Sequence, residues 1–199
     1  MLRRLGAIAV GGGSEAGAFA AARRLVANGA TALVSAGLAG GLEPALSPGQ
    51  RAIPAEILYD GTTYKVDPTL LRRFGGATVV RLAAVATPVA RAADKARLFA
   101  ATGAAVVDME SGAVAVVATA AGLPFAVLRV VCDPAGRDLP AAALAALDGN
   151  GTIAVLRVLA SVLRHPGQIP ALLRLARDAA TARAGLRAMA GEIADSPAV

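Results

Sequence analysis

The stretch from Val106 to Arg137 constrains the fold of this 199-residue chain more than any other part of the sequence. An apolar run ends at Asp108, a helical pattern of apolar residues follows as far as Gly122, and a second apolar run ends at Asp133. This order of strand, helix and strand is typical of an α/β fold, in which ligands bind beyond the carboxyl ends of the strands. We therefore expect the two acids that end the runs to lie close to one ligand site.

Strands and helices alternate along the rest of the chain, which predicts a single three-layer α/β/α domain over residues 1–190 with a mixed, largely parallel central sheet. Residues 191–199 are predicted to form a disordered tail. The other predicted elements are strands at 52–58 and 79–86, a hairpin tip at 60–61, a short helix at 67–73 and helices at 91–102, 141–147, 153–163 and 169–189. In the helix at 91–102 the pattern places Asp94, Lys95 and Arg97 outward.

Two glycine-rich segments follow predicted strands. Residues 11–17 (GGGSEAG) follow a strand at 5–10 and open a helix that runs to about residue 29, whereas residues 35–42 (SAGLAGGL) follow a strand at 31–34. Backbone N–H groups in such turns suit an anion. A dinucleotide fingerprint is disfavoured, because the second strand ends in Ser35 and not in an acid. The alternative for the second segment is a tight turn whose glycines only permit positive φ.

Composition limits the chemistry. One cysteine and one histidine exclude a disulfide framework and the usual zinc clusters, so no metal site is expected. No organic cofactor is expected either, because the dinucleotide pattern is disfavoured. The net charge is +6, and the segment from Arg157 to Arg187 contains six arginines but only one acid, Asp178. This basic segment is either a solvated helix face or a surface for phosphate or anionic lipid. His165, before a proline, is interpreted as a helix-end residue rather than a base.

Several of these segments resemble one enzyme family. The residues from Asp108 to Ala113 (DMESGA) and the strand end at Cys132-Asp133 resemble the nucleoside phosphorylase superfamily, which includes purine nucleoside phosphorylases and methylthioadenosine/S-adenosylhomocysteine nucleosidases. The segments RDLP at 137–140 and LRHPGQIPALLRLARD at 163–178 look like its hopanoid-associated phosphorylase branch. The resemblance spans roughly residues 10–180.

The resemblance implies a role for each matching residue. Asp133 would protonate the leaving purine, and Glu110 would hold the ribose hydroxyls with Met109 packed on the sugar, while Cys132 and Thr87 would lie near the base. Phosphate would be a co-substrate, held by Gly12, Gly13, Ser35, Gly37, Ala39, Gly40 and Arg137. The alternatives from the sequence alone are that Asp133 caps a turn and that Glu110 is a first-turn acid favoured by the helix dipole.

The implied activity is cleavage of the N-ribosyl bond of a 5′-substituted adenosine, first of all phosphorolysis of adenosylhopane with release of adenine in hopanoid biosynthesis. A hydrolytic nucleosidase and a non-catalytic purine-binding protein remain as alternatives. The family implies a homo-oligomer, a dimer or a hexamer, and no nucleic-acid partner is expected. No signal peptide is evident, so a cytoplasmic protein is expected, with peripheral contact at the inner membrane face through the basic C-terminal helix as one option.

The sequence departs from the family in two places. The nucleosidases activate water with a glutamate after their first strand, but this chain begins with what resembles the second strand, and Glu15 is no clear substitute. The enzyme is therefore phosphorolytic without that base, or its start is truncated, or its activity is impaired. In addition, Leu38 replaces a serine that would donate to phosphate.

Overall fold

The structure, a computed structural model, describes residues 6–140, 143, 167 and 169–195. Seven strands form one mixed sheet in the order β2-β7-β1-β6-β5-β3-β4. The strands are β1 (Leu33–Gly41), β2 (Arg51–Ala52), β3 (Pro54–Tyr59), β4 (Thr62–Lys65), β5 (Val79–Ala84), β6 (Val106–Asp108) and β7 (Phe125–Asp133). The described helices are α1 (Glu15–Ala27), α2 (Pro68–Arg73), α3 (Ala92–Thr102), α4 (Ser111–Ala120) and α7 (Ile169–Asp195).

The centre of the sheet is the parallel pair β1 and β7. Their register runs from Leu33 opposite Phe125 to Gly40 opposite Asp133, with an irregularity between Ala39 and Gly40. The pairs β3/β5 and β5/β6 are also parallel, whereas β1/β6, β2/β7 and β3/β4 are antiparallel. The segment from 106 to 137 thus forms the expected strand, helix and strand, and both strands lie next to β1.

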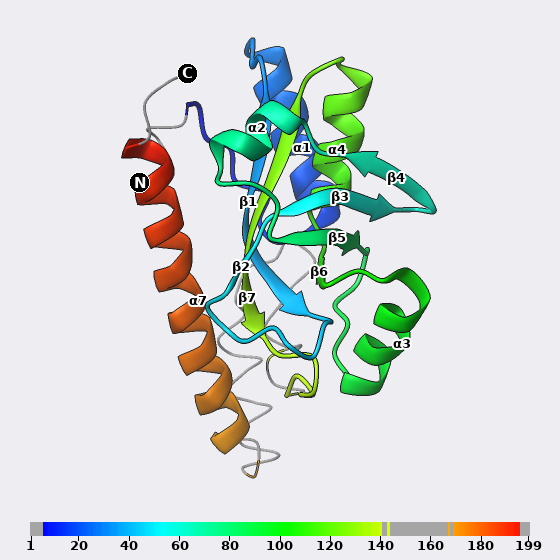
Figure 1. Cartoon of the computed structure of the whole chain (residues 1–199), viewed down its shortest axis with the longest axis vertical. Coiled ribbons are helices and arrows are strands. Elements are labelled where there is room, and N and C mark those ends of the chain that lie inside the picture. The colour runs from blue at the N-terminus through cyan, green and yellow to red at the C-terminus, as the bar shows by residue number, and fades with distance from the viewer. Residues whose placement is uncertain (1–5, 141–142, 144–166, 168, 196–199) are drawn as a thin grey trace.

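Helices cover both faces of this sheet (Figure 1). The long helix α7 packs against β7, β1 and β2, with Gly185 placed against Val130. Helices α1 and α4 pack on each other, and α4 also contacts the sheet, on the face toward which Arg129 points. The expected three-layer architecture with a mixed sheet is confirmed. In the part of the chain that the structure describes, no helix combines the length and the apolarity needed to cross a membrane.

The glycine-rich segment at 35–42 is not a loop. Ser35 to Gly41 belong to β1, in which Ser35 to Gly40 pair with β7 and Gly41 pairs with β6, so the predicted end of the strand at Val34 is wrong. The glycines are needed here because buried side chains lie against the strand. A Cβ at Gly37 would lie 2.9 Å from Nη1 of Arg129, and one at Gly40 would lie 3.4 Å from Asp133 Oδ1.

Other boundaries also differ from those predicted. Residues 7–10 form no strand, and the strand predicted at 52–58 is divided at Ile53 into β2 and β3. The last helix continues to Asp195, so residues 191–195 are helical and not a tail. The hairpin tip is confirmed: Asp60 and Gly61 have φ of 47° and 71°, the left-handed values that a two-residue hairpin turn requires. The predicted helices at 141–147 and 153–163, and His165, lie outside the described residues.

In the turn that leads into α1, Gly17 packs closely against the backbone of Gly11. Ser14 caps the helix by accepting a hydrogen bond from Gly17 N at 3.2 Å. A Cβ at Gly17 would lie 1.9 Å from the carbonyl oxygen of Gly11, so Gly17→Ala must push the segment off the helix. We expect the variant to lose about 1–3 kcal/mol of unfolding free energy in urea denaturation, as for other overpacked sites.

A matched control is Gly191→Ala in α7, where an added Cβ meets nothing within 4 Å. This variant should be neutral or more stable by up to about 1 kcal/mol, because alanine favours helix. Equal stability of the two alanine variants would contradict the close contact at Gly17.

Tyr59 gives the fold a measurable alkaline pH dependence. Its hydroxyl donates a hydrogen bond to Glu15, and this bond, followed by burial, raises the pKa of Tyr59 from 10.0 to about 12. A folded-state pKa above the unfolded value stabilises the fold below pH 10, and this contribution is lost as pH rises through 12. Between pH 9 and 12, we expect the melting temperature of Tyr59→Phe to fall less than that of the wild type in thermal unfolding. Parallel pH curves for the two proteins would disprove the contact.

Candidate active site

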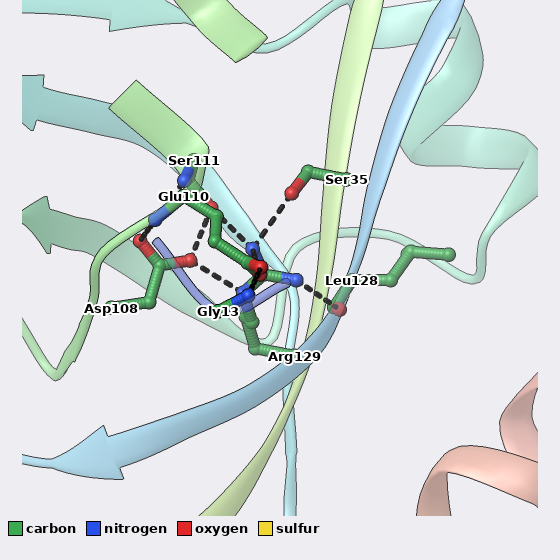
Figure 2. Close-up of polar contacts among 7 residues, drawn as sticks. All are labelled: Gly13, Ser35, Asp108, Glu110, Ser111, Leu128 and Arg129. Carbon is green, nitrogen blue, oxygen red and sulfur yellow. Dashed lines mark hydrogen bonds and ion pairs between the residues drawn. The ribbon is translucent and has the colours of Figure 1, made fainter. Parts of the chain in front are cut away.

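A fully buried arginine organises the polar residues between β1, β7 and α4 (Figure 2). Arg129, in the middle of β7, pairs through Nε with the buried carboxylate of Asp108 at the end of β6. Its Nη2 donates to Ser35 Oγ at 2.7 Å and to Ser111 Oγ at 3.0 Å. The guanidinium is therefore held in one orientation by three different elements.

Asp108 also fixes the start of α4. Its Oδ1 accepts the backbone N–H of Ser111 at 3.1 Å, and its Oδ2 accepts the Ser111 hydroxyl. The carboxylate thus satisfies free N–H groups at the helix start as well as the arginine. Every buried side-chain nitrogen and oxygen among the described residues has a hydrogen-bond partner. Asp108 is consequently a structural member of the cluster.

Glu110 differs from Asp108 because its side chain reaches solvent. The side chain is 24% exposed, with Oε2 lying 3.5 Å from Nη2 of Arg129 and Oε1 accepting the backbone N–H of Gly13 at 2.9 Å. In the glycine-rich segment before α1, the backbone N–H group of Gly13 donates to the carboxylate of Glu110. The two contacts hold Glu110 in place and leave part of it accessible to a ligand.

A cavity of about 360 Å³ opens beside Glu110. It is bounded by the N-terminal segment at 8–13, by one side of α1 and by the first half of β1. Glu110 is the one charged residue and Ser35 the one hydroxyl residue among the residues that line it, and nearly all others are alanine, valine, leucine, isoleucine or glycine. The cavity is therefore apolar with a single anionic edge.

Asp133 lies four residues beyond Arg129 on β7 and has a different partner. Its side chain is buried, and it forms an ion pair with Lys95 of α3. The structure contradicts the prediction that Lys95 points outward, since its side chain is fully buried. The side of α3 that carries Lys95 therefore faces the end of β7. There the carboxylate of Asp133 is the charge partner that a buried lysine requires.

Cys132 is a half-buried thiol next to Asp133. Its Sγ donates to Asp133 Oδ1 at 3.0 Å. Burial, and then the charge of Asp133, raises the pKa of the Cys132 thiol well above its usual value. The thiol stays protonated near neutral pH, which agrees with its interpretation as a packing or contact residue and not a nucleophile.

The structure brings only some of the predicted site residues together. Gly12, Gly13, Ser35, Gly37 and Glu110 line the cavity, and Met109 precedes Glu110 in the turn into α4. Ala39 and Gly40 lie further along β1 inside the sheet, beside Asp133 and Cys132 at the end of β7. Thr87 is exposed in the segment between β5 and α3.

Arg137 does not lie with the glycine residues. Its guanidinium pairs with Asp178 of α7, and its carbonyl oxygen accepts a hydrogen bond from Lys95. The arginine that contacts the cavity-lining residues Ser35 and Glu110 is the buried Arg129, which sequence reasoning missed. The available signal was a charged residue inside the apolar run from 125 to 131. A charge is kept in a buried strand only when partners satisfy it.

Among the described residues, no group of three or more histidine, cysteine, aspartate or glutamate side chains could hold a metal ion. The chemistry available at the two clusters is that of carboxylates, a guanidinium, an ammonium and backbone N–H groups. Such groups bind hydroxyls and anions and transfer protons.

Comparison with known proteins identifies the family. Residues 4–165, more than half of the chain, match the family model described as the phosphorylase superfamily. The chain belongs to the phosphorylase superfamily. A comparison of the chain with curated proteins found no match.

Solved structures show the same fold. The nucleosidase for 5′-methylthioadenosine and S-adenosylhomocysteine from Helicobacter pylori is 17% identical with a TM-score of 0.60, covering 90% of this chain and 76% of that chain. The corresponding enzyme from Colwellia psychrerythraea, in complex with adenine, is 19% identical with a TM-score of 0.59, covering 74% of each chain. The enzyme from Streptococcus pneumoniae is 18% identical with a TM-score of 0.56, covering 60% of this chain. The present chain spans 64% of the length of the Streptococcus pneumoniae enzyme, slightly less than two thirds.

Proposed function

We propose that this protein cleaves the N-ribosyl bond of a 5′-substituted adenosine and releases adenine. The observation that carries the proposal is the carboxylate of Glu110, which Gly13 and Arg129 hold at the edge of an apolar cavity while part of it stays exposed. Membership of the phosphorylase superfamily supports it. The structural relatives named above are nucleosidases acting on adenosine derivatives, which agrees with the proposed substrate class.

The ribose is the part of the substrate that Glu110 would bind. Breaking the C1′–N bond places positive charge on the ribose ring, and a fixed carboxylate that accepts hydrogen bonds from ribose hydroxyls stabilises that charge. Because Arg129 and Gly13 already orient the carboxylate, no reorganisation of Glu110 is needed during the reaction. Met109, the preceding residue, would pack on the sugar.

The leaving adenine must receive a proton, and Asp133 is the proposed acid. It ends β7 beside Cys132, on the strand that also carries Arg129. A positioned carboxylic acid contributes typically about 10²–10⁴-fold to the rate of such a step. Thr87, exposed between β5 and α3, would lie against the base.

Phosphate is the proposed nucleophile. One of its oxygens would form the new bond to C1′ as the bond to adenine breaks, which gives a ribose 1-phosphate derivative. The glycine-rich backbone at Gly12 and Gly13 lines the cavity and is the part of it that favours an anion, and phosphate would share the N–H group of Gly13 with Glu110. Leu38 supplies no hydroxyl, so water as nucleophile, and therefore hydrolysis, remains the second candidate.

The lining of the cavity supports an apolar 5′ substituent. A zwitterionic homocysteine group would lose its hydration in a cavity whose only charged lining residue among those described is Glu110. A hydrocarbon group such as the hopane of adenosylhopane, or a methylthio group, gains from the same burial. Adenosylhopane is accordingly our first choice of substrate and methylthioadenosine the second.

The test is to incubate the purified protein with adenosylhopane, methylthioadenosine and S-adenosylhomocysteine, each with and without phosphate, and to quantify adenine and the sugar product. The proposal predicts phosphate-dependent release from an apolar substrate with a ribose 1-phosphate product. Release without phosphate would identify the hydrolase. Adenine bound tightly without turnover of any substrate would favour the non-catalytic purine-binding alternative.

Two further expectations concern the surroundings of the protein. Helix α7 buries Ala182 and Met189 against the sheet and exposes Arg177, Arg183 and Arg187. We keep peripheral contact of this basic face with the inner membrane as a proposal, tested by cosedimentation with anionic and neutral lipid vesicles. A cytoplasmic homo-oligomer likewise remains a proposal, which the mass in solution decides.

A further inference from the structure

Lys95 is a buried lysine to which the proposed reaction assigns no role. It is one of only two lysines in the sequence and is fully buried, whereas Lys65 on β4 is exposed. Burying an ammonium group is costly unless its charge and its donors are matched. A lysine at such a position therefore depends on the groups that accept its hydrogen bonds.

The ammonium group is matched completely. Besides the carboxylate of Asp133, Nζ donates to the carbonyl oxygens of Pro134 at 3.0 Å and of Arg137 at 3.2 Å. An ammonium has three donors, and each has one acceptor here. Lys95 thus fixes both the end of β7 and the backbone of the turn that follows it. Its partners Asp133 and Arg137 lie 38 and 42 residues further along the sequence.

Asp133 in turn has both oxygens engaged, Oδ2 by Lys95 and Oδ1 by the thiol of Cys132. In this arrangement the mobile proton of the pair resides on the nitrogen. A carboxylate with an ammonium holds the same number of protons as a carboxylic acid with an amine. The pair therefore contains the proton that an acid at position 133 must deliver, without any co-reactant.

We propose that Lys95 is the positioning residue of Asp133 and the source of the proton that Asp133 passes to the leaving base. An N–H bond of the Lys95 ammonium breaks as an O–H bond forms on Asp133, and this O–H bond breaks as an N–H bond forms on adenine. Lys95 is left as a neutral amine, and after adenine departs Asp133 takes up a proton from water and returns it to Lys95. The inference rests on the proposed N-ribosyl cleavage and adds the origin of the proton to it.

The main test is a double-mutant cycle of Lys95→Met and Asp133→Asn on adenine release, with Lys65→Met as the control lysine variant. We expect Lys95→Met to lower kcat about 100-fold or more, with KM within about twofold, because the acid step and not substrate binding is affected. In the Asp133→Asn background the same change should have no further effect on kcat. An equal loss in both backgrounds, or a loss below threefold in the single variant, would overturn the proposal.

Chemical rescue separates proton supply from mere space filling. In Lys95→Ala, added ethylamine or propylamine should raise kcat at least about tenfold, since a protonated amine can occupy the space left by the lysine side chain. Tetramethylammonium carries the charge without a transferable proton and should restore nothing. Equal rescue by both cations, or rescue by neither, would remove proton supply from the role of Lys95.

Thermal unfolding distinguishes this inference from the proposed function itself. Absence of adenine release by the wild type on every substrate would overturn the proposed function. The pairing of Lys95 and Asp133 can still be tested in that case, by comparing the unfolding temperatures of the single and double variants. Each single variant leaves one buried charge unpaired, so the double variant should unfold at a higher temperature than either. A double variant that loses the sum of the two single losses would overturn the pairing.

Discussion

Replacing Arg129 with methionine is expected to destabilise the protein by about 3–5 kcal/mol, the cost of leaving a buried charge without its partner. Arg129 is fully buried and pairs with Asp108, which is 8% exposed. The variant also removes the donors to Ser35 and Ser111. Since small domains are stable by only about 5–15 kcal/mol, urea denaturation should show a large shift of the midpoint.

Two matched variants make this result interpretable. Arg81→Met breaks an ion pair with Glu56 whose side chains are 33% and 18% exposed, and it should cost about 1 kcal/mol or less. Arg129→Met combined with Asp108→Asn removes the charge mismatch and should recover part of the loss. A cost for Arg129→Met no greater than for Arg81→Met would show that the buried cluster does not hold the fold.

The second large effect is on activity. Glu110→Gln is expected to reduce adenine release by about 10²–10³-fold, because the amide keeps the size of the side chain but loses the negative charge that we propose faces the ribose. Its hydrogen bond from Gly13 can be kept by the amide oxygen, so stability should change little. Steady-state kinetics of adenine release, with thermal unfolding as a check, measure both expectations.

Glu56→Gln is the control for this change. Glu56 on β3 also faces an arginine, Arg81, but does not line the cavity, so its conversion to an amide should leave kcat/KM within about twofold. Loss of activity of the same size in both variants would indicate a general effect of removing carboxylates. Full activity of Glu110→Gln would remove Glu110 from the site.

The sequence predicts the segment from 106 to 137 well because its signals are local. Apolar runs end at Asp108 and Asp133, and Gly122 ends the helix between them, so each boundary is set by residues next to it. The resemblance to one family then assigns Glu110 and Asp133 their roles. The family assignment and the three-layer fold are confirmed, while the roles of these residues remain proposals.

The contacts that position the site could not be predicted, because each joins residues distant in sequence. Gly13 and Glu110 are 97 residues apart, Ser35 and Arg129 are 94 apart, and Lys95 and Asp133 are 38 apart. Helical spacing placed Lys95 outward, since periodicity treats a charge as exposed and carries no information about a buried partner. Likewise, the glycines of β1 look like a turn until Arg129 is placed against Gly37.

The proposed contact between Glu110 and the ribose is tested by a cycle that varies both the enzyme and the ribose. Adenine release by the wild type and by Glu110→Gln is measured with a 5′-substituted adenosine and with its 2′-deoxy counterpart. If Glu110 binds the ribose hydroxyls, removing the hydroxyl should cost the wild type about tenfold or more relative to the variant, since the intrinsic reactivity of the deoxy bond cancels in the ratio. The same ratio in both enzymes would contradict a contact between Glu110 and the ribose hydroxyls.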